Sequence, residues 1–158
     1  MNSRWAKKKS SRQGTRLTKE TAIKRCRSGG GPLARRRQPR LRERLEAHAD
    51  EFVVWDVGLG AAANPLTVLR HTRDLPVNVR LESFDHTLAP LELALHHAAE
   101  LGYFGGYETA VKQLLANAST DFNDGARSVN WRVHVADFPS LLAQPAAEKL
   151  PKPHAILF

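Results

Sequence analysis

Between residue 50 and the end of the chain, four short stretches carry the hydrophobic patterns of β-strands. Residues 52–57 and 155–158 are almost continuous apolar runs, whereas apolar and polar residues alternate in 77–84 and 131–135. Short apolar runs and period-two alternation are both typical of strands. The sequence therefore predicts four strands in the last two thirds of the chain.

Between these stretches, apolar residues recur at the three- and four-residue spacing of a helix face. Helices are expected over 40–49, 65–72, 88–101 and 107–117. Pro65, preceded by Asn64, indicates where the second of these helices begins. Because strands alternate with helices, the order predicts an α/β fold with an open parallel sheet and crossover connections.

The first expected strand passes directly into a turn of small residues. Asp56 is followed by Gly58 and Gly60, and three alanines come next. Glycines let a ligand approach bare backbone, and a carboxylate beside them can hold the ligand's polar end. This order predicts a nucleotide-type ligand at a strand–turn–helix junction.

Two further acids stand at corresponding positions in the chain. Asp85 and Asp137 fall at or just past the ends of the second and third strands, as Asp56 does in the first. Ligands of open parallel sheets bind beyond the carboxyl ends of the strands. We therefore expect the three carboxylates to lie together along the edge of the sheet that these strand ends form, called the rim below. Structural roles remain as alternatives: Asp56 can cap a turn, and Asp85 can cap the following helix as well as bind a ligand.

The glycine spacing narrows the class of ligand. A dinucleotide site has a third glycine and a phosphate-binding P-loop has Gly-Lys-Ser/Thr, and the run from Gly58 to Ala63 has neither. The acid two residues before Gly58 repels pyrophosphate but favours an ammonium group. S-adenosylmethionine fits, because it carries a cationic amino-acid end, a ribose diol and an adenine, without phosphate.

These motifs resemble those of class I S-adenosylmethionine-dependent methyltransferases. The segment 56–60 resembles their motif I, 83–85 their acidic second-strand tip, and 135–137 their third-strand acid. The residues of segments 64–66 and 88–94 are similar to those of the MnmC-like tRNA methyltransferases. These enzymes complete 5-methylaminomethyl-2-thiouridine at the wobble position of bacterial tRNAs. This resemblance implies a Rossmann-like open parallel sheet and methylation of an aminomethyl group on a modified wobble uridine.

The resemblance also implies a role for each matched residue. The two glycines of motif I let the backbone approach the methionine part of the cofactor, and Asp56 anchors its amino group directly or through water. Asp85 accepts hydrogen bonds from the ribose hydroxyls. Asp137 binds the adenine amino group, with Phe138 against the ring. The implied cofactor-binding residues are thus Asp56, Gly58, Gly60, Asp85, Asp137 and Phe138.

The chain departs from the family's pattern at its C-terminal side. Family members have a seven-stranded sheet and an aspartate directly after the fourth strand, near the substrate amine, whereas this sequence stops at Phe158. We therefore expect residues 40–158 to be the N-terminal part of such a domain, with four of its seven strands, in a truncated or split gene model. Its catalytic residues are unknown, and we expect weak cofactor binding without turnover.

Positive charge is concentrated at the start of the chain. Residues 1–50 hold 16 Lys and Arg against 4 Asp and Glu, and the remainder holds 8 against 12. Mutual repulsion and few large apolar groups predict a disordered basic arm over 1–39. Three interpretations stay open: the arm binds tRNA phosphates, is a solvated tail, or is an artefact of translation start. The alternative function is a non-catalytic nucleic-acid-binding protein that acts through this arm.

Composition argues against several other classes of protein. Cys26 is the single cysteine, so no intrachain disulfide forms, which suits the cytoplasm. No stretch approaches the roughly 20 apolar residues of a membrane span, and no signal-peptide core is present. The seven histidines show no metal-ligand spacing, so no metal site is expected.

Overall fold

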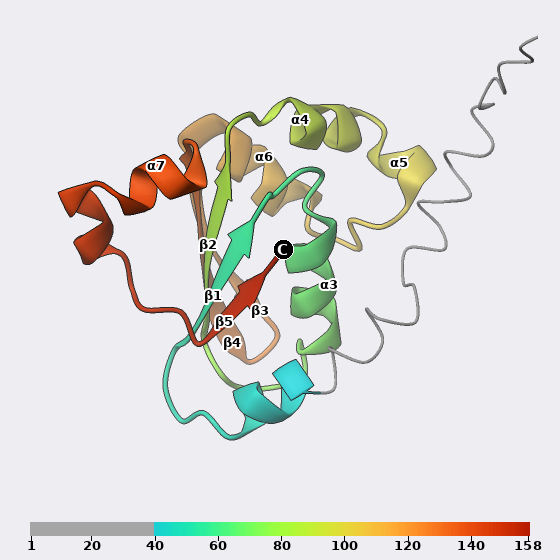
Figure 1. Ribbon diagram of the computed structural model, residues 1–158. Coiled ribbons are helices and arrows are strands. Elements are labelled where there is room, and N and C mark those ends of the chain that lie inside the picture. Colours follow the sequence, from blue (N-terminus) through green and yellow to red (C-terminus); the bar gives the residue numbers. More distant parts are fainter. Residues whose placement is uncertain (1–39) are drawn as a thin grey trace, which may run out of the picture.

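Five strands form one open sheet in the order β3-β4-β2-β1-β5 (Figure 1). The computed structural model describes residues 40–158, and the predicted disordered arm over 1–39 lies outside the described residues. The strands are β1 (Phe52–Val57), β2 (Val79–Asp85), β3 (Ser119–Asp124), β4 (Arg127–Val135) and β5 (Ala155–Leu157). Neighbours pair in parallel except β3 and β4, which are antiparallel. The fold is α/β with a mostly parallel open sheet, compatible with a Rossmann-like arrangement.

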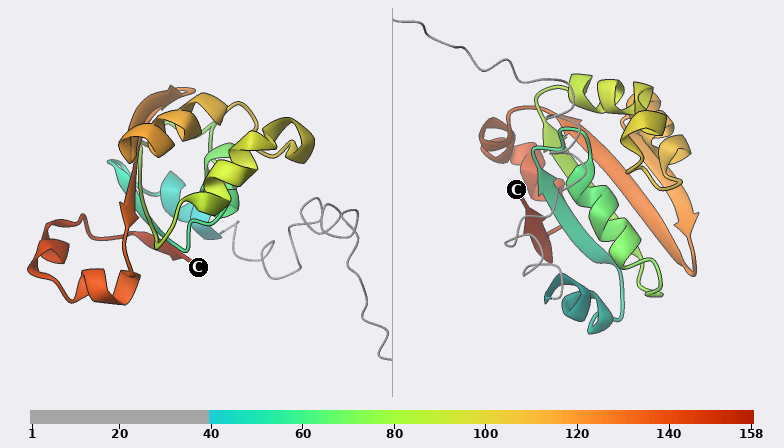
Figure 2. Two further views of the ribbon diagram at one scale, coloured as in Figure 1. Left: turned by 90° about the horizontal axis from the view of Figure 1, so that it is seen from above. Right: turned by 90° about the vertical axis from the view of Figure 1, so that its right-hand side faces the viewer.

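Helices follow most of the strands and lie on both sides of the sheet (Figure 2). A short helix over 40–46 precedes β1. The others are α3 (Ala63–His71), α4 (Ala89–His96), α5 (Ala98–Leu101), α6 (Glu108–Asn117), α7 (Phe138–Leu142) and the 3-10 helix η1 (Pro145–Lys149). The α3, α4 and α6 helices cover one face, and α7 lies on the opposite side (Figure 2). No helix within residues 40–158 has the length and apolar character that a membrane span needs.

The expected sheet of four parallel strands is wrong in one respect, because β3 adds a fifth, antiparallel strand. Only two residues, Gly125 and Ala126, separate β3 from β4, and Gly125 takes the positive φ of 71° that this tight hairpin requires. β3 lies at the edge of the sheet, and Phe122 is its single large apolar residue. An edge strand of this kind lacks the apolar alternation by which strands are found in a sequence.

The predicted helices have the right positions but different ends. The helix expected over 88–101 is interrupted at His97, where α4 ends and α5 begins. The helix expected from Pro65 begins two residues earlier, at Ala63, and its N-cap is Ala62 with a φ of 60°. Asn64 therefore lies inside the first turn and does not cap it. The small residues of the turn, rather than the Asn-Pro pair, set the start of α3.

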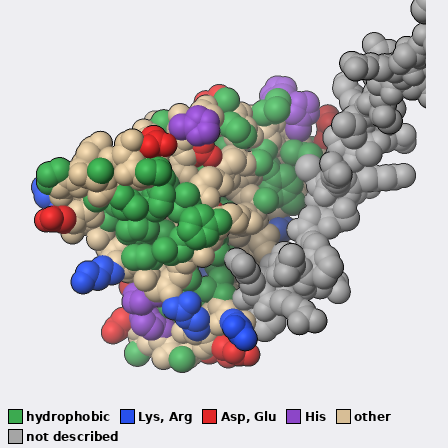
Figure 3. Space-filling model, in the orientation of Figure 1, with side chains coloured by type: hydrophobic (Ala, Val, Ile, Leu, Met, Phe, Trp, Pro, Cys, Tyr) green, Lys and Arg blue, Asp and Glu red, His purple; other side chains and the backbone are tan. Residues whose placement is uncertain are grey.

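The two faces of the sheet differ because side chains alternate along each strand. On the face under α3 and α6, Val54, Leu81 and Trp131 are fully buried and form the centre of the core. On the opposite face, Phe84 packs against Phe138 of α7 with 4.9 Å between ring centroids. Exposed apolar side chains gather on α7, β5 and the terminal residue (Figure 3), namely Leu142, Ile156 and Phe158.

A buried ion pair fastens the β3–β4 hairpin to the end of α3. The Arg127 guanidinium, wholly inaccessible to solvent, donates to Asp124 Oδ2 at 2.9 Å and to the carbonyl oxygens of Leu69 and Thr72. The Tyr107 hydroxyl donates to the same Asp124 oxygen at 2.9 Å. The hairpin is thus held by charge and hydrogen bonds at a point where its own apolar residues are few.

Candidate ligand site at the strand tips

Asp56 lies near the end of β1, with its side chain turned into the helix-covered face of the sheet. It is fully buried, and its Oδ2 accepts a hydrogen bond from Ser83 Oγ at 3.2 Å. Its other oxygen, Oδ1, is buried and has no hydrogen-bond partner among the described residues. Buried carboxylate oxygens are normally paired, because an unpaired one costs free energy. The unpaired oxygen is the strongest sign of a missing partner in the region of the strand tips.

Burial also raises the pKa of the Asp56 carboxyl from 3.8 to about 6. The hydrogen bond from Ser83 opposes this rise and the nearby Asp85 charge adds to it, so that the pKa of about 6 is the net result. The carboxylate is therefore mostly ionised at neutral pH, although its surroundings disfavour the charge. A cationic ligand group close to Oδ1 would relieve this cost.

A chain of hydrogen bonds holds Asp56 in place from across the sheet. Trp131 Nε1 on β4 donates to Ser83 Oγ at 2.9 Å, and that hydroxyl donates to Asp56. The support from Ser83 and Trp131 was not predicted from the sequence. One sign was available, because Ser83 interrupts the apolar alternation of Val79 and Leu81 on the inward face of β2.

The glycine turn follows β1 and lies against the end of β2. The amides of Gly58 and Leu59 both donate to the Phe84 carbonyl, which ties the turn to the neighbouring strand. Gly58 and Gly60 have φ angles of 84° and 51°, which favour glycine. A Cβ atom on Gly58 would meet nothing within 4 Å, and one on Gly60 would meet only the Gly58 carbonyl, at 3.9 Å. Both glycines thus face open space where a ligand can reach the backbone.

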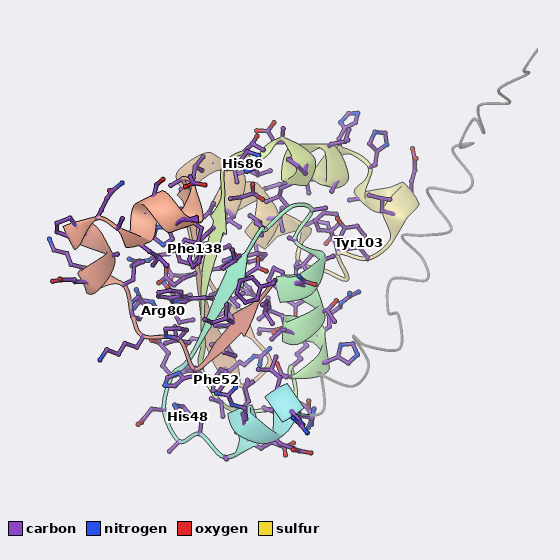
Figure 4. All side chains as sticks on the ribbon, viewed as in Figure 1. His48, Phe52, Arg80, His86, Tyr103 and Phe138 are labelled. Atoms are coloured by element: carbon purple, nitrogen blue, oxygen red, sulfur yellow. The ribbon has the colours of Figure 1, made fainter. Side chains whose placement is uncertain are left out.

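Asp85 ends β2 and is bonded to the glycine turn. Its Oδ2 accepts from the Gly60 amide at 2.8 Å, and its Oδ1 accepts from the Thr87 amide at 3.3 Å. The exposed His86 ring lies 3.2 Å from Oδ1 (Figure 4). Asp85 does not cap α4, where Thr87 Oγ1 accepts from the Ala89 amide instead. The structure therefore brings Asp85 next to Gly60, as a shared ligand site requires.

Asp137 follows β4 on the same rim but has a structural task as well. Its Oδ2 accepts from both the amide and the hydroxyl of Ser140, so Asp137 is the N-cap of α7. These bonds lower the pKa of Asp137, and its side chain is exposed. Phe138 points toward the sheet (Figure 4), where its ring packs on Phe84 and lies edge-on to Trp55. The Phe138 ring is thus engaged by two aromatic side chains of the sheet.

A separate cavity of about 350 Å³ lies between the helix over 40–46, α3 and β5. Its lining is mostly apolar, includes Arg40 and Arg44, and contains none of the predicted cofactor residues. No Asp or Glu side chain lines it, and its two arginines disfavour a cationic ligand. For a cationic ligand, the strand tips are therefore the better candidate site.

Comparison with known proteins identifies no relative of this chain. No family model matches it, and neither a curated protein nor a solved structure does. Among the described residues, no group of three or more His, Cys, Asp or Glu side chains is arranged to hold a metal ion. The functional interpretation therefore depends on the residues of the rim.

Gly60→Ala is expected to separate a ligand effect from a folding effect. The added methyl group makes only ordinary contact, so folding should lose about 1 kcal/mol from the positive φ. Affinity for S-adenosylhomocysteine should fall by about tenfold or more, because the methyl group occupies the ligand's approach to the backbone. Calorimetry and urea unfolding measure the two effects.

Gly102→Ala is the matched control for this variant. Gly102 ends α5 with a φ of 63° and open space around its Cβ position, so its conformational cost is similar. It lies outside the glycine turn and should leave affinity unchanged. Equal affinity losses in the two variants would remove the glycine turn from the site.

Proposed function

We propose that residues 40–158 are the cofactor-binding part of a class I S-adenosylmethionine-dependent methyltransferase domain. The buried Asp56 carboxylate, with its unpaired oxygen near the end of the strand that leads into the glycine turn, carries this proposal. An ammonium group that reaches this oxygen, directly or through water, supplies the donor that it lacks. A pyrophosphate would bring a second negative charge toward the same place, which disfavours a dinucleotide.

The remaining residues of the rim fit the rest of this cofactor. A carboxylate has about four acceptor positions, so Asp85 can accept ribose hydroxyls in addition to the two amides that it already binds. Both bonds from Ser140 go to Asp137 Oδ2. Oδ1 can therefore accept from an adenine amino group while α7 stays capped. The open space at Gly58 and Gly60 leaves room for the methionine part.

S-adenosylmethionine, when bound, supplies a methyl group on a positively charged sulfur that is an effective leaving group. The protein's part is to fix the cofactor's orientation and to provide charge at the right place, rather than to form a covalent intermediate. Asp56 and Asp85 belong to neighbouring strands and are held by hydrogen bonds, so both are positioned before a ligand arrives. By its resemblance to the MnmC-like enzymes, we propose an aminomethyl group on a modified wobble uridine of tRNA as methyl acceptor.

Calorimetric titration of the full chain tests the class of ligand. We expect S-adenosylmethionine and S-adenosylhomocysteine to bind weakly but saturably, and NAD to produce no heat. Saturable binding of NAD, with none of S-adenosylhomocysteine, would overturn the proposal in favour of a nicotinamide-dependent enzyme.

A second candidate, nucleic-acid binding through the basic arm, is favoured by the charge distribution of the sequence. Residues 1–50 hold 16 basic against 4 acidic residues, so an electrostatic interaction with RNA phosphates is expected to weaken steeply as salt rises. Salt-sensitive tRNA binding by a chain that gives no heat with S-adenosylhomocysteine would favour this candidate alone. If both ligands bind, the arm supports the proposed methyltransferase by holding its substrate.

A further inference from the structure

The loop between α5 and α6 makes a direct hydrogen bond to the glycine turn. Tyr103, in this loop, donates its hydroxyl to the carbonyl oxygen of Ala61 at 2.7 Å, across 42 residues of sequence. Ala61 lies between Gly60, whose amide binds Asp85, and Ala62, the N-cap of α3. The bond therefore reaches the middle of the segment that the ligand would touch.

This carbonyl group needs a donor from outside the helix. The helical series of α3 begins one residue later, where the Leu66 amide donates to the Ala62 carbonyl. The Ala61 carbonyl precedes that series and so takes no part in it. The amide of the same peptide unit, on Ala62, donates to the Leu59 carbonyl at 2.8 Å. With Tyr103 on its oxygen, the peptide unit between Ala61 and Ala62 is fixed at both ends.

The loop that carries Tyr103 is itself firmly anchored. Phe104 is fully buried in the core and stacks on the Tyr103 ring with 4.7 Å between centroids. Tyr107 is buried and bonded to Asp124. Gly105 lies so close to Arg70 of α3 that an added Cβ would approach its side chain to 3.0 Å. The hydroxyl of Tyr103 is thus presented from a fixed support rather than from a loose loop.

We infer that Tyr103 is a positioning residue, which fixes the glycine turn in the conformation that receives the cofactor. The identity of the ligand in this inference rests on the proposed function. The effect of Tyr103 on the turn does not. Ala62 has a φ of 60°, a conformation that costs a non-glycine residue free energy. A hydrogen bond on the preceding carbonyl helps to hold that conformation, so the turn is shaped before the ligand binds.

Tyr103→Phe tests this inference, because it removes the hydroxyl and keeps the ring. We expect affinity for S-adenosylhomocysteine to fall about five- to tenfold, the effect of one lost hydrogen bond. We also expect faster hydrogen exchange at the Ala62 amide in the protein without ligand. Thr120→Val is the control, since it removes a hydroxyl hydrogen bond between β3 and α6 and leaves both the glycine turn and the Tyr103 loop untouched.

The two measurements separate this inference from the proposed function. If the wild-type chain does not bind S-adenosylhomocysteine, the proposed function fails, and exchange at Ala62 still decides whether Tyr103 fixes the turn. The inference is overturned if exchange at Ala62 is no faster in Tyr103→Phe than in Thr120→Val. It is also overturned if the wild type binds and both variants keep its affinity.

Discussion

Asp56→Asn should leave the chain at least as stable as the wild type at neutral pH while it removes most of its affinity for S-adenosylhomocysteine. Burial raises the pKa of this carboxyl from 3.8 to about 6. A rise of this size corresponds to about 3 kcal/mol of folding free energy lost when the group is ionised. Asparagine keeps the shape without the charge and leaves an amide that lacks one partner, which offsets part of the gain.

The pH dependence of stability provides a second readout for this variant. Because the pKa of Asp56 is higher in the folded than in the unfolded chain, its contribution is fully present below the ordinary pKa of 3.8 and is lost as pH rises through about 6. Wild-type stability should therefore fall between these values more than that of Asp56→Asn, as urea unfolding across this range would measure. Glu92→Gln, at an exposed position, controls for loss of a surface charge.

Two results for Asp56→Asn would count against this account. A variant with unchanged ligand affinity would show that Asp56 does not face the cationic end of the ligand. A large loss of stability at neutral pH would show that the carboxylate has a structural partner and that its charge is not a cost to folding.

Asp124→Asn is expected to have the largest effect on stability, a loss of about 3–5 kcal/mol. The substitution leaves the Arg127 guanidinium buried without its counter-ion and weakens the acceptor of the Tyr107 hydroxyl. An arginine side chain stays charged in a protein, so the buried charge would remain. Urea unfolding, followed by tryptophan fluorescence, measures the change.

Arg73→Gln is the control for this second variant. Arg73 also pairs with Asp124, at 2.8 Å, but 60% of its side chain is exposed, so its loss should cost less than about 1 kcal/mol. Similar losses of stability in the two variants would show that the burial of Arg127 does not increase the contribution of its ion pair with Asp124.

Positions of elements along the chain were easier to predict than the relations between them. The strand over 52–57 was predicted with the bounds that β1 has, because its residues form one apolar run. The β3 strand was missed since its edge position leaves it polar, and the signal for it was the short turn at Gly125. The hydrophobic pattern of a sequence indicates which residues are buried. It does not reveal β3, because this strand pairs with β4 through its backbone while few of its side chains are apolar.

The rim shows the same difference between position and environment. Asp56, Asp85 and Asp137 were expected at strand ends, and each is found there. Their individual surroundings could not be predicted, because these depend on residues distant in sequence. Ser83 supports Asp56, Gly60 binds Asp85, and Tyr103 holds the turn only once the strands and loops have come together.

The most direct measurement is a titration of the 15N-labelled full chain with S-adenosylhomocysteine, followed residue by residue through its amide resonances. The account predicts saturable shifts concentrated at Gly58, Gly60 and Asp85, and their loss in Asp56→Asn. Absence of shifts throughout the chain would contradict it. So would shifts confined to the cavity between α3 and β5, at residues such as Val68 and Ile156, with the rim unchanged.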